Sequence, residues 1–134
     1  MHLIFGGAYQ GKLEYAKERY QLEEQDIYFC SAGKEGEGCP SGPEIDFGKR
    51  AIVRLDQFVL CCVRSGVEAK EYLAEHREEW EDAILLCTDV SAGIVPYERE
   101  MRDWREMVGR TLTYLGKEAK EVTRVFCGLP QQLK

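Results

Sequence analysis

The sequence has few of the features that mark a secreted, membrane or nucleic-acid-binding protein. No apolar run approaches the roughly 18–20 residues that a membrane-spanning helix needs, and the first residues lack the basic start and apolar length of a signal peptide. Asp and Glu (24) outnumber Lys and Arg (18), so the net charge is −6 and nothing here neutralises a phosphate backbone. We therefore expect a cytoplasmic protein with no membrane span and no nucleic-acid partner.

Metal-ligating patterns are scarce as well. There are only two histidines, His2 and His76, and the cysteines form no C-x-x-C pair, so a zinc site is poorly supplied. His76 stands among charged residues, which predicts a solvated helix face. The remaining expectation is that the thiols are reduced and mostly buried, with the loop residue Cys39 exposed. The cysteines in apolar settings are Cys30, Cys61, Cys62, Cys87 and Cys127.

What is present is the composition of a small globular protein. The 134 residues are 44% apolar and 31% charged, enough for one domain with a substantial core. We expect a single α/β domain over residues 1–134.

Apolar strand-like runs alternate with helix-like periodicity along the chain. Strands are predicted at residues 3–5, 27–30, 83–87 and 122–127, and helices at 13–22, 67–80 and 98–119. Residues 49–63 suit either a helix or the end of a strand. This alternation predicts a parallel sheet with helices on both faces, whose sites form where strand C-termini meet the following loops.

Between two of these strands, residues 31–48 contain five glycines and two prolines. Such a composition does not hold regular structure. We predict a long, flexible loop here, of the kind that is usually functional or disordered.

A glycine-rich stretch follows the first predicted strand and opens the first predicted helix. This stretch, called the glycine loop below, is Gly6-Gly7-Ala8-Tyr9-Gln10-Gly11-Lys12-Leu13. It fits the pattern G-x-x-x-x-G-K-[ST] at every position but the last. In that arrangement backbone N–H groups and the lysine hold phosphate, and the final hydroxyl binds Mg²⁺. Leu13 has no oxygen, so we predict nucleotide binding with a weakened magnesium site; a purely structural turn is the alternative.

Two segments in the C-terminal half carry a family resemblance together with the glycine loop. They are Leu85-Leu86-Cys87-Thr88-Asp89-Val90-Ser91-Ala92-Gly93-Ile94-Val95-Pro96, and Arg102-Asp103-Trp104-Arg105-Glu106-Met107-Val108-Gly109. With the tail of residues 128–134, they resemble the adenosylcobinamide kinase/adenosylcobinamide-phosphate guanylyltransferase family of cobalamin biosynthesis. The corresponding family patterns are N-E-V-G-x-G-I-V-P, R-x-F-R-D-x-x-G and G-x-P-x-x-x-K.

The resemblance implies a P-loop-type parallel α/β fold, ATP or GTP as the nucleotide, a cobinamide-type corrinoid as partner and a homo-oligomer, a trimer in the best-known case. Family members phosphorylate a cobinamide hydroxyl and then transfer GMP through a histidine intermediate. By this likeness Lys12 neutralises phosphoryl charge, and Asp89, in place of the family's glutamate, holds magnesium through water or orients the acceptor. For Asp89 an ordinary loop-capping aspartate is the alternative. Asp56 is a looser match for the acidic residue after the family's central strand, and its role stays open.

The departures from the family pattern concern chemistry. No histidine lies between His2 and His76, where the family has its nucleophile, and Leu112 and Thr113 replace an asparagine–glutamine pair. We therefore expect no guanylylated intermediate. Two functions stay open: a shortened kinase-like enzyme, and a catalytically degenerate nucleotide- or corrinoid-binding relative that serves as a partner subunit.

Overall fold

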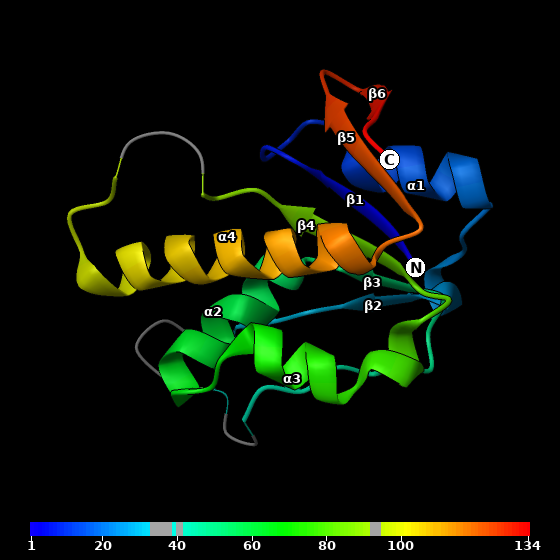
Figure 1. The fold of residues 1–134 in the computed structure, drawn as a ribbon. Helices are drawn as coiled ribbons and strands as arrows, with labels where there is room; N and C mark the ends of the chain where they lie inside the picture. Colours follow the sequence, from blue (N-terminus) through cyan, green and yellow to red (C-terminus); the bar gives the residue numbers. More distant parts are fainter. Residues whose placement is uncertain (33–38, 40–41, 92–94) are drawn as a thin grey trace.

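The computed structural model describes residues 1–32, 39, 42–91 and 95–134 (Figure 1). Two short 3₁₀ helices span Glu24–Asp26 and Arg77–Trp80. The other elements, in chain order, are β1 (His2–Gly6), α1 (Lys12–Tyr20), β2 (Ile27–Phe29), β3 (Ala51–Val53), α2 (Leu55–Ser65), α3 (Ala69–Glu75), β4 (Ile84–Thr88), α4 (Arg99–Glu118), β5 (Glu121–Phe126) and β6 (Leu129–Gln132).

The strands of the described residues form one sheet in the order β2-β3-β4-β1-β5-β6. All neighbouring pairs are parallel except β5 and β6, which form an antiparallel hairpin at the edge. Because β1 lies between β4 and β5, the register places Gly6 beside Thr88 at the carboxyl edge of the sheet. This edge is where a parallel α/β sheet builds its sites.

Helices cover both faces of the sheet, as predicted. Helix α1 packs on one face through the buried Ala16, and α2, α3 and α4 cover the other face (Figure 1). The larger core lies on this second face and includes Phe58, Leu73 and Trp80, each at most 1% exposed. The indole nitrogen of Trp80 donates to the Leu73 carbonyl at 2.8 Å, which satisfies the buried N–H. The α/β prediction of a P-loop-type sheet is confirmed.

The ambiguous segment of residues 49–63 contains both a strand and a helix, because β3 is followed directly by α2. The predicted helix over residues 67–80 is interrupted at His76, where α3 ends and a 3₁₀ turn begins. The antiparallel strand β6 was not predicted. Its residues are all exposed, so it lacks the apolar alternation that marks a strand in a sequence.

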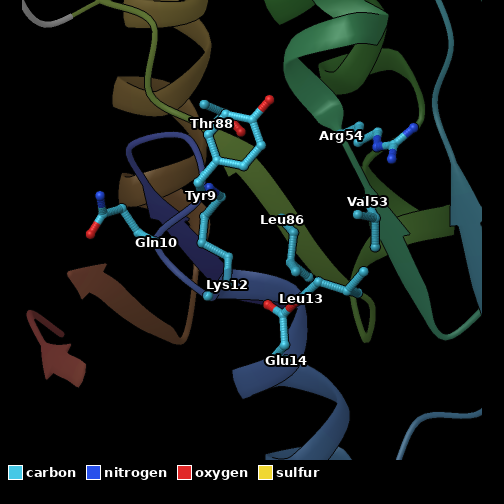
Figure 2. Close-up of a pocket in the computed structure, with 10 residues that line it drawn as sticks. Tyr9, Gln10, Lys12, Leu13, Glu14, Val53, Arg54, Leu86 and Thr88 are labelled. Atoms are coloured by element: carbon cyan, nitrogen blue, oxygen red, sulfur yellow. The ribbon is translucent and has the colours of Figure 1, made fainter. Parts of the chain in front are cut away.

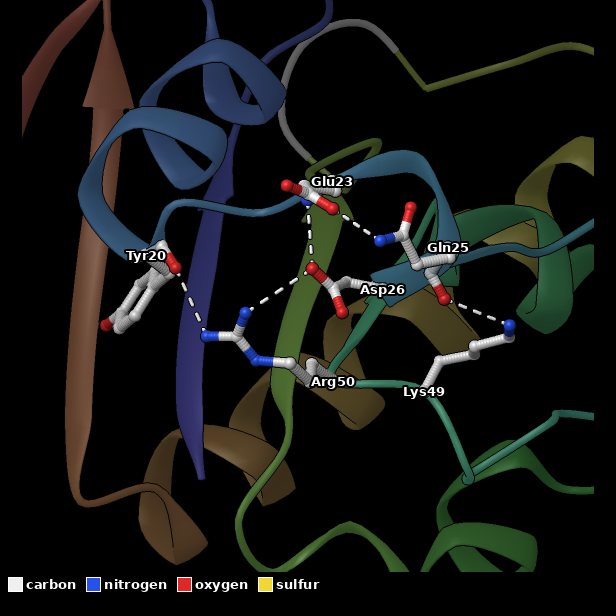
Figure 3. A network of polar contacts seen from close by, with 6 residues as sticks. All are labelled: Tyr20, Glu23, Gln25, Asp26, Lys49 and Arg50. Atoms are coloured by element: carbon white, nitrogen blue, oxygen red, sulfur yellow. Dashed lines mark hydrogen bonds and ion pairs between the residues drawn. The ribbon is translucent and has the colours of Figure 1, made fainter.

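Polar contacts fix the edge of the sheet opposite to the site (Figure 3). Arg50, just before β3, donates to the Tyr20 carbonyl at 3.1 Å and lies 3.4 Å from the Asp26 carboxylate. Lys49 donates to the Gln25 carbonyl at 3.0 Å. These contacts tie the end of α1 and the following 3₁₀ turn to the start of β3.

The cysteine prediction is wrong in part. Cys39 and Cys61 form a disulfide, so Cys39 is not a free, exposed thiol and Cys61 is not reduced. Cys127 is exposed because it lies in the β5–β6 turn rather than in a buried strand. The other three, Cys30, Cys62 and Cys87, are buried free thiols as expected.

The prediction for His76 is also wrong, because its ring is not on a solvated face. The ring is only 32% exposed, stacks on Tyr72 at 4.3 Å between centroids, and its Nδ1 is 2.8 Å from the Tyr72 carbonyl. The ring of Phe47 also stacks on the His76 ring, with 5.5 Å between centroids.

Part of the predicted loop over residues 31–48 lies outside the described residues, namely 33–38 and 40–41. Residues 42–48 contain no helix or strand, but Ile45 is buried in the larger core. The Tyr28 hydroxyl also donates to the Glu44 carbonyl at 3.2 Å. This half of the segment is therefore packed against the domain. No helix in the described ranges has the length and apolar character needed to cross a membrane.

Candidate functional site

The glycine loop leaves β1 at the carboxyl edge and enters α1 at Lys12. Gly6 is required by packing, because a Cβ there would lie 2.4 Å from the Val125 carbonyl oxygen. Gly11 caps α1 with φ 89°, a conformation that favours glycine, and a Cβ there would lie 3.3 Å from the Gly128 Cα. Two of the glycines in the pattern thus let the loop approach β5 and the β5–β6 turn closely.

Gln10 fastens the same loop to the β5–β6 turn. Its side-chain oxygen accepts a hydrogen bond from the Cys127 N–H at 2.6 Å, and its carbonyl accepts one from the Gly128 N–H at 2.8 Å. Neighbouring Tyr9 has φ 58° and a fully exposed side chain. The loop is held from one side while Tyr9 stays free to contact a ligand.

Lys12 is half-buried at the start of α1. Its Nζ donates to the Gly7 carbonyl at 2.6 Å, within its own loop. Burial lowers the pKa of the Lys12 ammonium, and the charges of Asp56, Cys87 and Glu14 act in the opposite direction. The lysine of the glycine loop thus lies against the backbone of its own loop and lines the cavity beside it.

Leu13, the residue in place of the usual serine or threonine, is half-buried. It packs against the smaller core with Tyr15 and Tyr20. The side chain also lines the cavity beside the loop. It offers no oxygen to a metal ion, so this position does not fit magnesium.

Two cavities adjoin each other at this edge of the sheet. The first, called the loop cavity, has a volume of about 220 Å³ and lies beside the glycine loop (Figure 2). The second, called the edge cavity, is about 630 Å³. Tyr9, Arg54 and Thr88 line both cavities. The edge cavity is completed by Ala8, Phe29, Cys30, Ser31, Ala32, Asp56, Gln57, Val90 and Trp104.

Asp56 is the carboxylate of this site. It is 6% exposed, lies in the first turn of α2, and its Oδ1 accepts a hydrogen bond from the Thr88 N–H at 3.0 Å. Its Oδ2 accepts one from Gln57 at 3.2 Å, and its carbonyl accepts one from the Trp104 indole at 2.8 Å. Asp56 is thus a buried carboxylate that lines a cavity, and its charge acts to raise the pKa of Lys12 against the larger effect of burial. These features make it a candidate general base.

The sequence contains a signal for this role. Asp56 follows the short apolar run Ala51-Ile52-Val53, and acidic residues after a parallel strand come to the carboxyl edge. The ambiguity between helix and strand over residues 49–63 concealed it.

Asp89, predicted to be catalytic, lies beside the glycine loop but does not line either cavity. Its N–H donates to the Gly6 carbonyl at 2.8 Å. Its Oδ1 accepts hydrogen bonds from the backbone and hydroxyl of Ser91, at 2.9 Å for the backbone N–H. In this structure the carboxylate fixes the turn after β4. The following residues 92–94, which include Gly93 and Ile94 of the family motif, lie outside the described residues.

Neither histidine lines the loop cavity or the edge cavity. His2 lies at the opposite edge of the sheet, where its Nε2 is 2.8 Å from the Thr123 hydroxyl, and His76 is bonded to Tyr72. Cys30 lines the edge cavity, but burial raises the pKa of its thiol to about 12. The thiol is therefore neutral and a poor nucleophile at physiological pH. Among the described residues no cluster of three or more His, Cys, Asp or Glu side chains is able to hold a metal ion.

These features define the class of protein: an α/β domain of the P-loop type with a glycine loop and a buried carboxylate at the carboxyl edge of the sheet. The family model described as cobinamide kinase / cobinamide phosphate guanyltransferase matches residues 59–133, and the chain belongs to this family. The match begins within α2 and continues through β6, so it includes Trp104 but neither the glycine loop nor Asp56. A search of curated proteins found no match.

Membership in this family confirms the resemblance to cobinamide kinases and guanylyltransferases of cobalamin biosynthesis. The family implies nucleotide use and corrinoid substrates. It does not decide which of these activities this chain performs.

Proposed function

We propose that this chain binds ATP or GTP through the glycine loop and phosphorylates a cobinamide-type corrinoid. The observation that carries the proposal is the arrangement of Lys12 and the buried Asp56 around two adjoining cavities. The loop cavity is of a size for phosphate groups, and the larger edge cavity admits the hydroxyl-bearing arm of an acceptor.

In this proposal Lys12 turns from the Gly7 carbonyl to the phosphates of the nucleotide, where its charge stabilises the transferring group. Asp56 accepts the proton of the acceptor hydroxyl while the hydroxyl oxygen attacks the terminal phosphorus and the nucleoside diphosphate leaves. Asp89 supports the reaction by holding the turn after β4 beside Gly6. Trp104 and Tyr9 supply apolar walls for the acceptor.

Magnesium receives no step in this account. Leu13 supplies no oxygen at the position where the loop normally binds the ion, and the Asp56 carboxylate already accepts two hydrogen bonds. Positioning and fixed charges are left to supply the catalysis.

Guanylyl transfer through histidine is not proposed. Neither histidine of the chain lines the loop cavity or the edge cavity. Incubation with labelled GTP is expected to leave no acid-labile GMP on the protein, and a mass shift of one GMP would contradict this.

The second candidate function is that of a catalytically degenerate binding protein or partner subunit in cobalamin metabolism. Leu13 and the absence of a histidine from the site favour it. It predicts nucleotide or corrinoid binding without phosphate transfer, whereas the kinase proposal predicts both.

The test is transfer of labelled phosphate from ATP or GTP to adenosylcobinamide. Asp56→Asn keeps an oxygen that accepts from Thr88, so the fold is expected to persist while the general base is lost. Transfer should fall by roughly 100-fold or more, with little change in nucleotide affinity. The matched control is Asp82→Asn, at the exposed opposite edge of the sheet. Equal transfer by both variants would contradict the role of Asp56, and nucleotide binding without any transfer would favour the degenerate function.

The family resemblance and the composition support a proposal about assembly and location. We propose a cytoplasmic homo-oligomer, and the β5–β6 hairpin exposes apolar side chains that such an assembly can use, among them Phe126 and Leu129. Light scattering at micromolar concentration that shows only a 15.4 kDa species would contradict the oligomer.

A further inference from the structure

Arg54 joins β3 to α2 in a conformation that is costly for an arginine. Its φ of 62° and ψ of 45° are left-handed, and this residue caps α2 by accepting a hydrogen bond from the Gln57 N–H at 2.9 Å. The neighbours Val53 and Leu55 are buried, so the surrounding structure fixes the backbone here. A non-glycine residue pays about 1 kcal/mol or more for this conformation, and such strain gathers at functional sites.

The side chain stands where the two cavities meet. Arg54 lines both the loop cavity and the edge cavity. Figure 2 shows it on the opposite side of the loop cavity from Lys12, with the guanidinium turned away from the lysine. The two cations therefore flank the space between the glycine loop and the edge cavity.

The charge of Arg54 has no acidic partner among the described residues. The guanidinium lies over the ring of Phe29, with 5.4 Å between the guanidinium carbon and the ring centroid. Four other arginines are held by carboxylates at 3.0–3.4 Å, namely Arg50, Arg64, Arg77 and Arg110. An arginine that lines a cavity and rests on an aromatic ring can turn toward an anion without breaking an ion pair.

We propose that Arg54 is a second cationic ligand of the bound phosphates and contacts the outermost phosphate of a nucleoside triphosphate at the junction of the two cavities. This inference rests on the proposed function. The guanidinium leaves Phe29 and presents its paired N–H donors to two phosphate oxygens. It supplies positive charge on the side where Leu13 leaves the loop without a metal ligand.

Because Arg54 acts on the outermost phosphate, its contribution depends on the length of the phosphate chain. The test uses the full chain, calorimetric titration without Mg²⁺, and four probes: AMP, ADP, ATP and inorganic tripolyphosphate. Arg54→Gln should lower the affinity for ATP and tripolyphosphate by about tenfold or more, the range of a lost charged hydrogen bond. AMP should be affected by less than about threefold, and Arg54→Lys should recover part of the ATP affinity.

The matched control is Arg124→Gln. Arg124 also rests on a phenyl ring, that of Phe126 at 5.6 Å, but it is exposed on β5 and lines neither cavity. The Arg124→Gln variant should bind ATP with the same affinity as the native chain. Equal ATP affinity for Arg54→Gln would overturn the inference.

A second variant separates binding from folding. Arg54→Gly relieves the left-handed strain, so its unfolding midpoint should stay the same or rise while ATP affinity falls as in Arg54→Gln. If Arg54→Gly is destabilised and Arg54→Gln binds ATP normally, Arg54 is only structural. If the native chain binds ATP and only Lys12→Ala loses affinity, the glycine loop binds phosphate and Arg54 does not. If the native chain binds none of the probes, the proposed function and this inference both fail.

Discussion

At the scale of single residues, Leu13 separates phosphate binding from magnesium binding. The side chain lines the loop cavity while it packs against the smaller core, so it has replaced a metal ligand with apolar contact. The backbone N–H groups and Lys12 are unaffected by this exchange. The site is therefore expected to hold phosphates by fixed charge rather than through a metal ion.

Leu13→Ser restores the missing oxygen and should make nucleotide binding depend on Mg²⁺. The native chain should show nearly the same ATP affinity with and without Mg²⁺. The variant should gain affinity only when Mg²⁺ is present, at a cost of about 2 kcal/mol in the free energy of unfolding because a half-buried side chain is shortened. Titrations of both proteins in EDTA and in Mg²⁺ measure this, and Leu13→Ala is the control for the lost packing. If the ATP affinity of Leu13→Ser is the same with and without Mg²⁺, position 13 does not face the phosphates.

A second residue-scale prediction concerns His2, which is buried against Thr123. Burial lowers the pKa of the His2 imidazole below its usual value, and the charge of Glu121 offsets this only in part. The unfolded chain then binds the proton more readily than the folded chain does. Stability should therefore fall as pH drops below about 6.5 and through the lower folded-state pKa, and it should be regained at higher pH.

Chemical denaturation of the native chain and His2→Gln between pH 5 and 8 measures this dependence. The native unfolding free energy should decrease toward pH 5 more steeply than that of the variant. Parallel curves would mean that His2 does not contribute to the pH dependence.

At the scale of elements, the glycine loop depends on the β5–β6 hairpin. Gly6 lies close to the Val125 carbonyl, and Gly11 lies close to Gly128. Gln10 accepts two hydrogen bonds from the β5–β6 turn. The hairpin thus sets the shape of the loop although it is remote in the sequence. The family match covers the hairpin, which places this support within the shared part of the chain.

Gly6→Ala should disturb both stability and binding, because its Cβ would lie 2.4 Å from a backbone oxygen. A loss of about 1–3 kcal/mol in unfolding free energy is expected, together with weaker nucleotide binding. Gly7→Ala is the control, since its Cβ would meet only the Gln10 side chain at 3.6 Å. Thermal unfolding and ATP titration of the two variants make the comparison. If Gly7→Ala proves the more damaging, the hairpin does not shape the loop as described.

How far the sequence predicts these elements varies for physical reasons. The glycine loop was predictable because its spacing and flanking elements are local. Asp56 was not assigned a role because β3 is only three residues long and runs into α2, which hides the strand end. Strand β6 gave no periodic signal because it is exposed throughout, and the Cys39–Cys61 bond joins residues 22 positions apart. Arg54 was overlooked because its significance lies in its backbone conformation and in a missing partner, which only the structure reveals.

At the scale of the whole molecule, one edge of the sheet carries the proposed chemistry and the other edge carries structural contacts. The carboxyl ends of β1, β3 and β4 bring together the glycine loop, Arg54 and Asp56. At the opposite, amino edge of the sheet, Arg50 and His2 form hydrogen bonds with Tyr20 and Thr123. The proposed function therefore depends on whether this carboxyl edge binds phosphate.

The most direct test is calorimetric titration of ATP and GTP into the native chain, Lys12→Ala and the control Lys17→Ala. Lys17 lies on the same helix but pairs with Glu24, away from the loop cavity. The native chain and Lys17→Ala should bind with equal affinity in the absence of Mg²⁺. Lys12→Ala should bind more weakly by about 1.5–3 kcal/mol, the range for a lost hydrogen bond to a charged group. No binding by the native chain at millimolar nucleotide, or equal binding by all three proteins, would contradict the account.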